Sequence, residues 1–347
     1  MQRREFVAAG LATLLAGPRS AGAQAPIHLS DMQFHSFFGP SINHSRPVAK
    51  AFAAGGATLV SWSVAGDALW MDPKTYRQSS EPKPGEALGW VEREIARIYA
   101  HCADQGLRVA LRPGDVDRAL KGEPHIVLSV EGANFIEGDI ARVKRAYDLG
   151  IRHLQLVHFT RNSLGDFQTE APQHGGLTEL GRRVVAECNR LGILVDLAHS
   201  AGPTVSQALA VSKVPVVWSH GSVKTGPAAP WNAMIWRARQ LPLELAKAIA
   251  AKGGVVGLWA LSFDVGTSYE TFADRMLELA DWLGDAHAAF GTDLNGLSGN
   301  AAIKTYTELR QVVSRWQALK VPEARIRRIA SENYARVLRT AMAGASG

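Results

Sequence analysis

Histidine and acidic residues recur at the ends of apolar segments along this 347-residue chain. Five strand-like segments end in a side chain that could bind a metal, and a sixth closes on a histidine. Imidazole and carboxylate groups suit zinc and related divalent ions, and a carboxylate shared by two ions would complete a dinuclear hydrolytic centre. A single histidine at a strand end is usually only hydrogen-bonded, but the repeated placement favours one shared site. The residues are His35, Glu131, His158, His199, His220 and Asp293.

The segments that carry these residues predict the fold. Short β-branched runs alternate with longer amphipathic stretches, which indicates parallel strands joined by crossover helices. A single (β/α)₈ barrel over residues 26–347 has eight strand positions, and its strand carboxyl ends open on one face, where the polar residues would meet. A doubly wound sheet is the alternative, but no glycine-rich phosphate turn follows the first strand. The nine candidate runs are 27–35, 57–64, 107–112, 125–132, 152–159, 193–200, 214–221, 253–260 and 287–296.

The run at 107–112 is the one that we exclude from the barrel. Too few residues separate it from the run at 125–132 to hold a helix, whereas parallel neighbours need a crossover of that kind. Eight candidates then remain for eight positions.

The first 25 residues are typical of an export signal. Paired arginines at Arg3 and Arg4 precede a short apolar stretch and then small residues around a plausible cleavage point. The paired arginines indicate a twin-arginine-type signal and a periplasmic or secreted protein. The apolar stretch is far shorter than the ~20 residues that a membrane-spanning helix needs.

The net charge, the two cysteines and most of the other histidines indicate no further functional site. The formal net charge of +6 comes largely from residues near the C-terminus at helical spacing, without interleaved aromatic residues, so no nucleic-acid partner is expected. Cys102 and Cys188 lie beside apolar neighbours, which favours two buried free thiols over a disulfide. A homodimer stays open. We take His28, His44, His101 and His125 as incidental, whereas His153 and His174 remain undecided.

Several motifs, in their order and spacing, resemble the membrane dipeptidase (renal dipeptidase) family of zinc peptidases. They are SVEGAN at 129–134, GGLTELG at 175–181, LGILVDLAH at 191–199, SHGS at 219–222 and FGTDLNG at 290–296, and the resemblance runs from about residue 27 to residue 338.

The resemblance implies two zinc ions and a role for each matched residue. Glu131 would bridge the ions, and His199 and His220 would hold the second one. His158 would orient the scissile carbonyl, while Asp293 would ligate a metal and move protons.

The family also has an arginine that holds the substrate carboxylate. Counting from His220 without gaps places Trp231 at that position. An insertion before the segment ARQLP aligns the following residues better and places Arg239 there, so we prefer Arg239.

The first strand departs from the family pattern. Where the family has Asp-x-His-x-Asp, this chain has Asp31, Gln33 and His35 at the same spacing. Glutamine offers only an amide oxygen, and a histidine in place of a carboxylate changes the charge of the site by one unit. A shifted register would make His35 the family histidine and place Phe37 at the next ligand position. Either register predicts a weaker first metal site beside an intact second site.

The resemblance therefore implies a metal-dependent dipeptidase that acts on small dipeptide-like substrates through a metal-activated hydroxide. One alternative is a one-metal or altered-metal amidohydrolase acting on another small amide or lactam. Another is a weakly active descendant that binds a small ligand. Metal content distinguishes them: two equivalents would favour the dipeptidase, one the altered amidohydrolase, and none the ligand-binding descendant.

Overall fold

The computed structural model describes residues 26–36, 47–297 and 299–344. The predicted export signal at residues 1–25 and the alternative ligand position at Phe37 lie outside these ranges.

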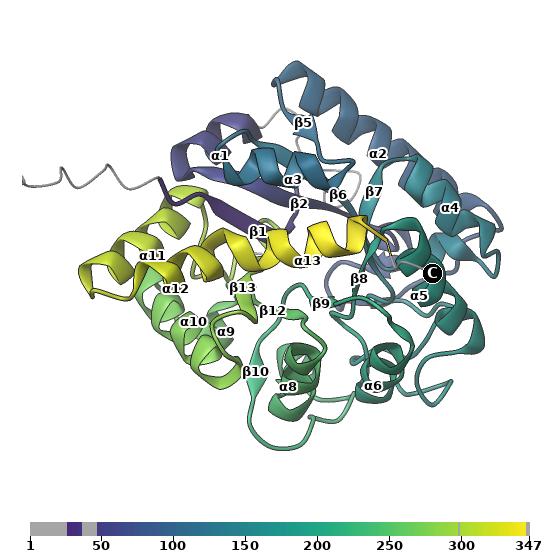
Figure 1. Ribbon diagram of the computed structural model, residues 1–347. Coiled ribbons are helices and arrows are strands. Elements are labelled where there is room, and N and C mark those ends of the chain that lie inside the picture. The colour runs from purple at the N-terminus through teal and green to yellow at the C-terminus, as the bar shows by residue number, and fades with distance from the viewer. Residues whose placement is uncertain (1–25, 37–46, 298, 345–347) are drawn as a thin grey trace, which may run out of the picture.

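Eight parallel strands form the central sheet, which confirms the predicted (β/α)₈ barrel (Figure 1). The sheet closes where the backbone N–H of Asp293 donates to the carbonyl of Gln33 (3.1 Å) and that of His35 donates to the carbonyl of Leu294 (3.0 Å). In order around the barrel the strands are β1 (Leu29–Phe34), β2 (Ala57–Ala65), β6 (His125–Glu131), β7 (Ile151–Gln155), β8 (Leu194–Asp196), β9 (Val217–Trp218), β12 (Val255–Leu258) and β13 (Ala288–Phe290).

The run at 107–112 is not a barrel position, as predicted, but the reason given for excluding it was wrong. It forms the two-residue strand β5 (Arg108–Val109), which pairs with the first residues of β6. An eight-residue helix, α3 (Pro113–Leu120), does fit before β6, because a proline in its first turn and Asp115 at its N-terminus start it abruptly. β5 is excluded because it is only two residues long. It also pairs with the start of β6 on the same edge that β7, the next barrel strand, occupies further along β6.

Helices surround the sheet and bury its outer face. Their apolar sides pack on strand residues such as Trp62, Leu128 and Val195 in the larger hydrophobic core. Among the described residues, none of the helices is both long and apolar enough to cross a membrane. The helices of the outer layer are α1 (Val48–Gly55), α2 (Glu86–Asp104), α4 (Ala141–Asp148), α5 (Glu179–Leu191), α6 (Gly202–Val211), α8 (Leu243–Ala251), α10 (Tyr269–Leu283), α11 (Tyr306–Ala318) and α12 (Glu323–Arg327).

The C-terminal helix α13 (Asn333–Met342) lies across the barrel and follows a π-helical turn at Arg328–Glu332 (Figure 1). Its residues Tyr334 and Leu338 form a second core with strand residues that face the barrel interior, including Leu59, Val127 and Leu194. These strand residues lie early in β2, β6 and β8. Helix α13 therefore covers the end of the barrel opposite the predicted site.

Short elements shape the loops after the strands. Helical turns at Ala68–Trp70 and Asn134–Ile136 and the short helices α7 (Ile235–Ala238) and α9 (Ser262–Val265) lie in these loops. Strands β3 (Met71–Asp72) and β4 (Arg77–Gln78) pair after β2, and β10 (Val223–Lys224) and β11 (Leu241–Pro242) pair after β9. Cys102 and Cys188 are buried and form no disulfide.

Candidate metal centre

The six predicted polar residues all lie at the carboxyl ends of barrel strands. Glu131 is the last residue of β6, and His35 follows β1 directly. The others come two or three residues after their strands, in the loops. All six line one cavity, together with Arg239. The barrel thus brings together residues as distant in the sequence as His35 and Asp293, which was the reason for predicting a shared site.

One oxygen of Glu131 faces a pair of histidines. Its Oε1 lies 3.2 Å from Nε2 of His199 and 3.3 Å from Nε2 of His220, and the two nitrogens are 3.0 Å apart. Within the described ranges, these three residues are the only group of three or more potential ligands whose atoms all lie within 4.8 Å of one another. Burial and nearby cationic groups lower the pKa of His199 well below its usual value, which favours the neutral imidazole that a metal requires. The set fits zinc.

The other oxygen of Glu131 faces His35. Its Oε2 lies 3.3 Å from Nε2 of His35, and that nitrogen is 3.4 Å from Oδ1 of Asp293. The Nδ1 of His35 contacts the carbonyl of Ser63 at 3.1 Å. A carbonyl only accepts, so Nδ1 carries a hydrogen and Nε2 is the nitrogen directed at both carboxylates. Burial alone would lower the pKa of His35, but Asp293 and Glu131 outweigh it and raise the pKa to about 10 in the metal-free protein.

The side chain of Gln33 also contacts His35. Its Nε2 lies 3.1 Å from Nε2 of His35, so its amide borders this group. Asp31 instead faces away from the cavity, where it accepts hydrogen bonds from Thr292 and Tyr306. Burial raises the pKa of Asp31 to about 6. The first strand therefore leads to His35 at the cavity with Gln33 beside it, and Asp31 closes the barrel against the loop after β13.

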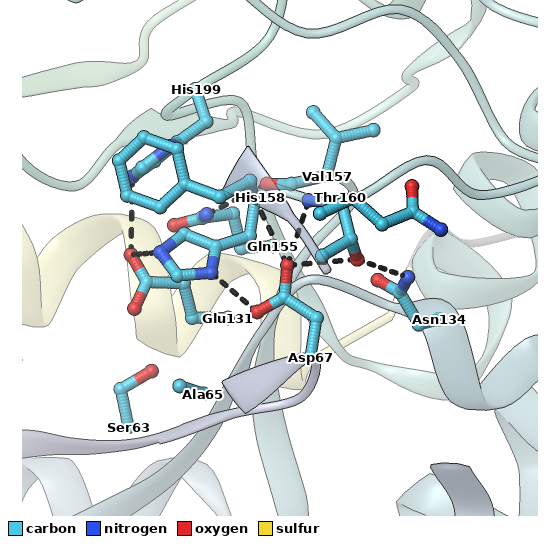
Figure 2. Close-up of polar contacts among 12 residues, drawn as sticks. Ser63, Ala65, Asp67, Glu131, Asn134, Gln155, Val157, His158, Thr160 and His199 are labelled. Carbon is cyan, nitrogen blue, oxygen red and sulfur yellow. Dashed lines mark hydrogen bonds and ion pairs between the residues drawn. The ribbon is translucent and has the colours of Figure 1, made fainter. Parts of the chain in front are cut away.

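Asp67, which the sequence reasoning missed, holds His158 (Figure 2). Its Oδ1 lies 2.6 Å from Nδ1 of His158, while its Oδ2 accepts from the backbone of Phe159 and from both the backbone and hydroxyl of Thr160. The ring stands between Asp67 and Glu131, with Nε2 at 3.5 Å from Oε1 of Glu131. Burial lowers the pKa of His158, but Asp67 and Glu131 outweigh it, and the pKa is raised. Asp67 comes shortly after the predicted strand at 57–64, and this position after a strand is the sequence feature that could have identified it.

Arg239 lies in the cavity as a buried cation, with none of its surface exposed. Its Nη1 donates to Oε1 of Gln168 at 2.8 Å, whereas its Nε and Nη2 have no hydrogen-bond partner within the described residues. Burial lowers the pKa of Arg239 to about 10, which still leaves it charged at neutral pH. Trp231 is 40% exposed and does not line the cavity. Gln168, which no sequence pattern indicated, also donates its backbone N–H to the carbonyl of His199 (2.8 Å).

The remainder of the cavity wall is mainly apolar, with Asn300 as a further polar residue. Trp236 and Phe263 stack at the opening with ring centres 6.0 Å apart, and Phe263 is 60% exposed. Trp259 lies below Arg239, with the guanidinium carbon 5.2 Å from the ring centre. The other apolar residues of the wall are Tyr76, Phe159, Ile235, Leu261 and Leu297.

Comparisons with known proteins identify a family. Residues 48–346 match the family described as membrane dipeptidase (peptidase family M19). The match begins after β1 and after His35, so it includes neither Gln33 nor His35.

Two fungal relatives are similar in sequence. The dipeptidase verJ of Clonostachys rogersoniana is 30% identical over 175 residues, which cover 49% of this chain and 43% of that protein. The dipeptidase tcpJ of Claviceps purpurea is 26% identical over 301 residues, which cover 84% of this chain and 68% of that protein. The chain thus spans less than half of the length of verJ.

A bacterial crystal structure shares the fold. It is a metallopeptidase from Rhodobacter sphaeroides liganded with a phosphinate mimic of the dipeptide L-Ala-D-Ala, with a TM-score of 0.71 and 22% identity. The similarity covers 91% of this chain and 99% of that one.

Proposed function

Because this chain belongs to the membrane dipeptidase family, we propose that it is a metal-dependent dipeptidase that hydrolyses the amide bond of small dipeptides. The observation that carries the proposal is the position of Glu131, whose two carboxylate oxygens face two separate groups of ligands. A bridging carboxylate of this kind is the arrangement that a two-metal hydrolytic site needs.

Two sets of side chains would hold the zinc ions, and only the first of them forms a group of three with all ligand atoms within 4.8 Å of one another among the described residues. His199 and His220 with Oε1 of Glu131 would hold one ion, and His35 and Asp293 with Oε2 of Glu131 would hold the other. Bound zinc would supply a water nucleophile at neutral pH, because it lowers the pKa of water to ~7. Asp293 stands beside the nitrogen of His35 and is the carboxylate placed to carry the proton to the leaving amine.

His158 is proposed to polarise the scissile carbonyl. Asp67 accepts a hydrogen bond from Nδ1 of His158. The other ring nitrogen, Nε2, therefore faces the cavity on the side of Glu131. A raised pKa favours the imidazolium, which donates a hydrogen bond from Nε2 to the oxygen that gains charge during attack.

Arg239 is proposed to hold the terminal carboxylate of the substrate. Its Nε and Nη2 are buried without a hydrogen-bond partner among the described residues, and the residue borders the cavity, so a carboxylate that reaches Arg239 would supply the acceptors that these nitrogens lack. The apolar wall favours dipeptides with neutral side chains.

A second candidate function is a one-metal amidohydrolase acting on another small amide. The contact of Gln33 with Nε2 of His35 favours it, because the amide occupies the space beside the nitrogen on which the second ion would depend. One bound equivalent of metal, in place of two, would support this alternative.

A substrate panel tests the proposal. The protein loaded with zinc is assayed against L-L dipeptides, L-D dipeptides and the corresponding dipeptide amides. L-D dipeptides are included because the Rhodobacter sphaeroides relative is liganded with a mimic of L-Ala-D-Ala. We expect hydrolysis of dipeptides with a free carboxylate and little of their amides. Equal rates on both would contradict the role of Arg239, and no hydrolysis of any dipeptide would contradict the function.

We further propose that residues 1–25 direct export and that residues 26–347 form the mature domain. Fractionation of cells that produce the full chain tests this, since paired substitution of Arg3 and Arg4 by lysine should retain the protein in the cytoplasm. Export that continues in this variant would contradict a twin-arginine route.

A further inference from the structure

Asp196 is a buried carboxylate that has no part in the proposed chemistry. It is the last residue of β8 and is 1% exposed. Its Oδ1 accepts from the backbone N–H of Ala198 and from that of Ser219, both at 2.9 Å. These two residues immediately precede His199 and His220, so one oxygen holds both of the loops that carry the histidine pair.

The other oxygen of this carboxylate lies against a histidine, in contact but without the alignment of a hydrogen bond. Oδ2 of Asp196 lies 3.2 Å from Nε2 of His153, a fully buried residue of β7. The other ring nitrogen of His153 lies 3.1 Å from the hydroxyl of Ser61 and 3.2 Å from that of Tyr334 on α13. His153 thus stands between helix α13 and Asp196.

The backbone beside Asp196 has an unfavourable conformation that nearby hydrogen bonds stabilise. His199 has a positive φ of 68°, a left-handed conformation that is unfavourable for a non-glycine residue and persists only where neighbours enforce it. The hydrogen bond to Ala198 comes one residue before that position, and Gln168 binds the carbonyl of His199 itself.

We propose that Asp196, through its hydrogen bonds to the N–H groups of Ala198 and Ser219, is a positioning residue that sets the separation and direction of His199 and His220 for zinc. This inference rests on the metal site of the proposed function. Removing the acceptor would leave two buried backbone N–H groups unpaired, which is unfavourable, and the loops would shift to relieve them. Since the ligands themselves remain, the expected loss is in zinc affinity, by about 10-fold to 100-fold.

Zinc affinity, measured by competition with a chromophoric chelator on the full mature protein, tests the proposal without any use of hydrolysis. Asp196→Ala should weaken the tighter of the two zinc sites by about 10-fold or more. Asp196→Asn should restore near-normal affinity, because its amide oxygen still accepts from both backbone N–H groups. Tyr334→Phe is the matched control, since it removes a buried hydroxyl from the same cluster without touching Asp196.

The outcomes separate this inference from the proposed function. Wild-type zinc affinity in folded Asp196→Ala, or an equal loss in Tyr334→Phe, would overturn the positioning role alone. A wild-type protein that binds no zinc would overturn both. If Asp196→Ala does not fold, Asp196→Ser replaces it, because a serine hydroxyl is too short to reach both N–H groups.

Discussion

Replacement of Arg239 by methionine separates substrate binding from chemistry. Methionine keeps an unbranched apolar stem beside Trp218 and Trp259 but removes the guanidinium. Two of the arginine's nitrogens have no hydrogen-bond partner among the described residues and are available to a carboxylate. The substitution therefore removes the proposed contact with the terminal carboxylate and leaves the metal ligands in place.

The structure sets the size of the effect. Hydrogen bonds to charged groups contribute about 1.5–3 kcal/mol each, so two give at least about 3 kcal/mol, or about 100-fold in kcat/KM. Burial of Arg239 prevents screening by solvent. Because the carboxylate is bound in both the ground state and the transition state, KM should rise more than kcat falls.

The assay compares a dipeptide with its C-terminal amide in the wild type, in Arg239→Met and in Trp231→Ala. The wild type and Trp231→Ala should prefer the free dipeptide by about 100-fold, and Arg239→Met should lose that preference. If Arg239→Met still prefers the free acid, and Trp231→Ala does not, the gap-free alignment is right and the reasoning from the buried guanidinium is wrong.

Four further perturbations test other parts of the site. His199→Ala and His220→Ala should each remove most hydrolysis and one equivalent of zinc without unfolding the barrel; normal turnover with unchanged zinc content would refute this. Asp67→Asn should lower kcat by about 100-fold or more with little change in KM, because an amide presents N–H where the ring nitrogen needs an acceptor; steady-state kinetics decides, and a normal kcat would contradict it. Gln33→His should tighten the weaker zinc site and raise activity at limiting zinc, and a zinc titration indistinguishable from the wild type would show that residue 33 is not at the site. Asp31 has its pKa raised by burial to about 6, so the native state binds its proton more tightly than the unfolded chain. The free energy of unfolding should therefore fall by about 3 kcal/mol as pH rises from about 4 through 6, and Asp31→Asn should flatten this slope in denaturant titrations of metal-free protein.

The sequence predicted the parts of the site that depend on strand direction alone. Parallel strands in a barrel place their carboxyl ends on one face, so Glu131, His199, His220 and Asp293 could be expected to meet without knowledge of the loops. Strand direction did not identify Arg239. That residue was found through an alignment, because its segment contains no barrel strand that would fix its place.

Residues that act through tertiary contacts were not predictable in this way. Asp67 binds a histidine 91 positions away, and Gln168 binds an arginine 71 positions away. Neither contact leaves a periodic pattern in the sequence. Helix α3 was missed for a different reason: the helix needs only eight residues, and its proline start lets it fit a short connection.

The most direct test of the account is the hydrolysis of a dipeptide while zinc is returned to metal-depleted protein. The account predicts that the depleted protein is inactive, that two equivalents of zinc bind with unequal affinity, and that activity rises as they do. Full hydrolysis by the depleted protein, or zinc-saturated protein without activity on any dipeptide, would contradict it.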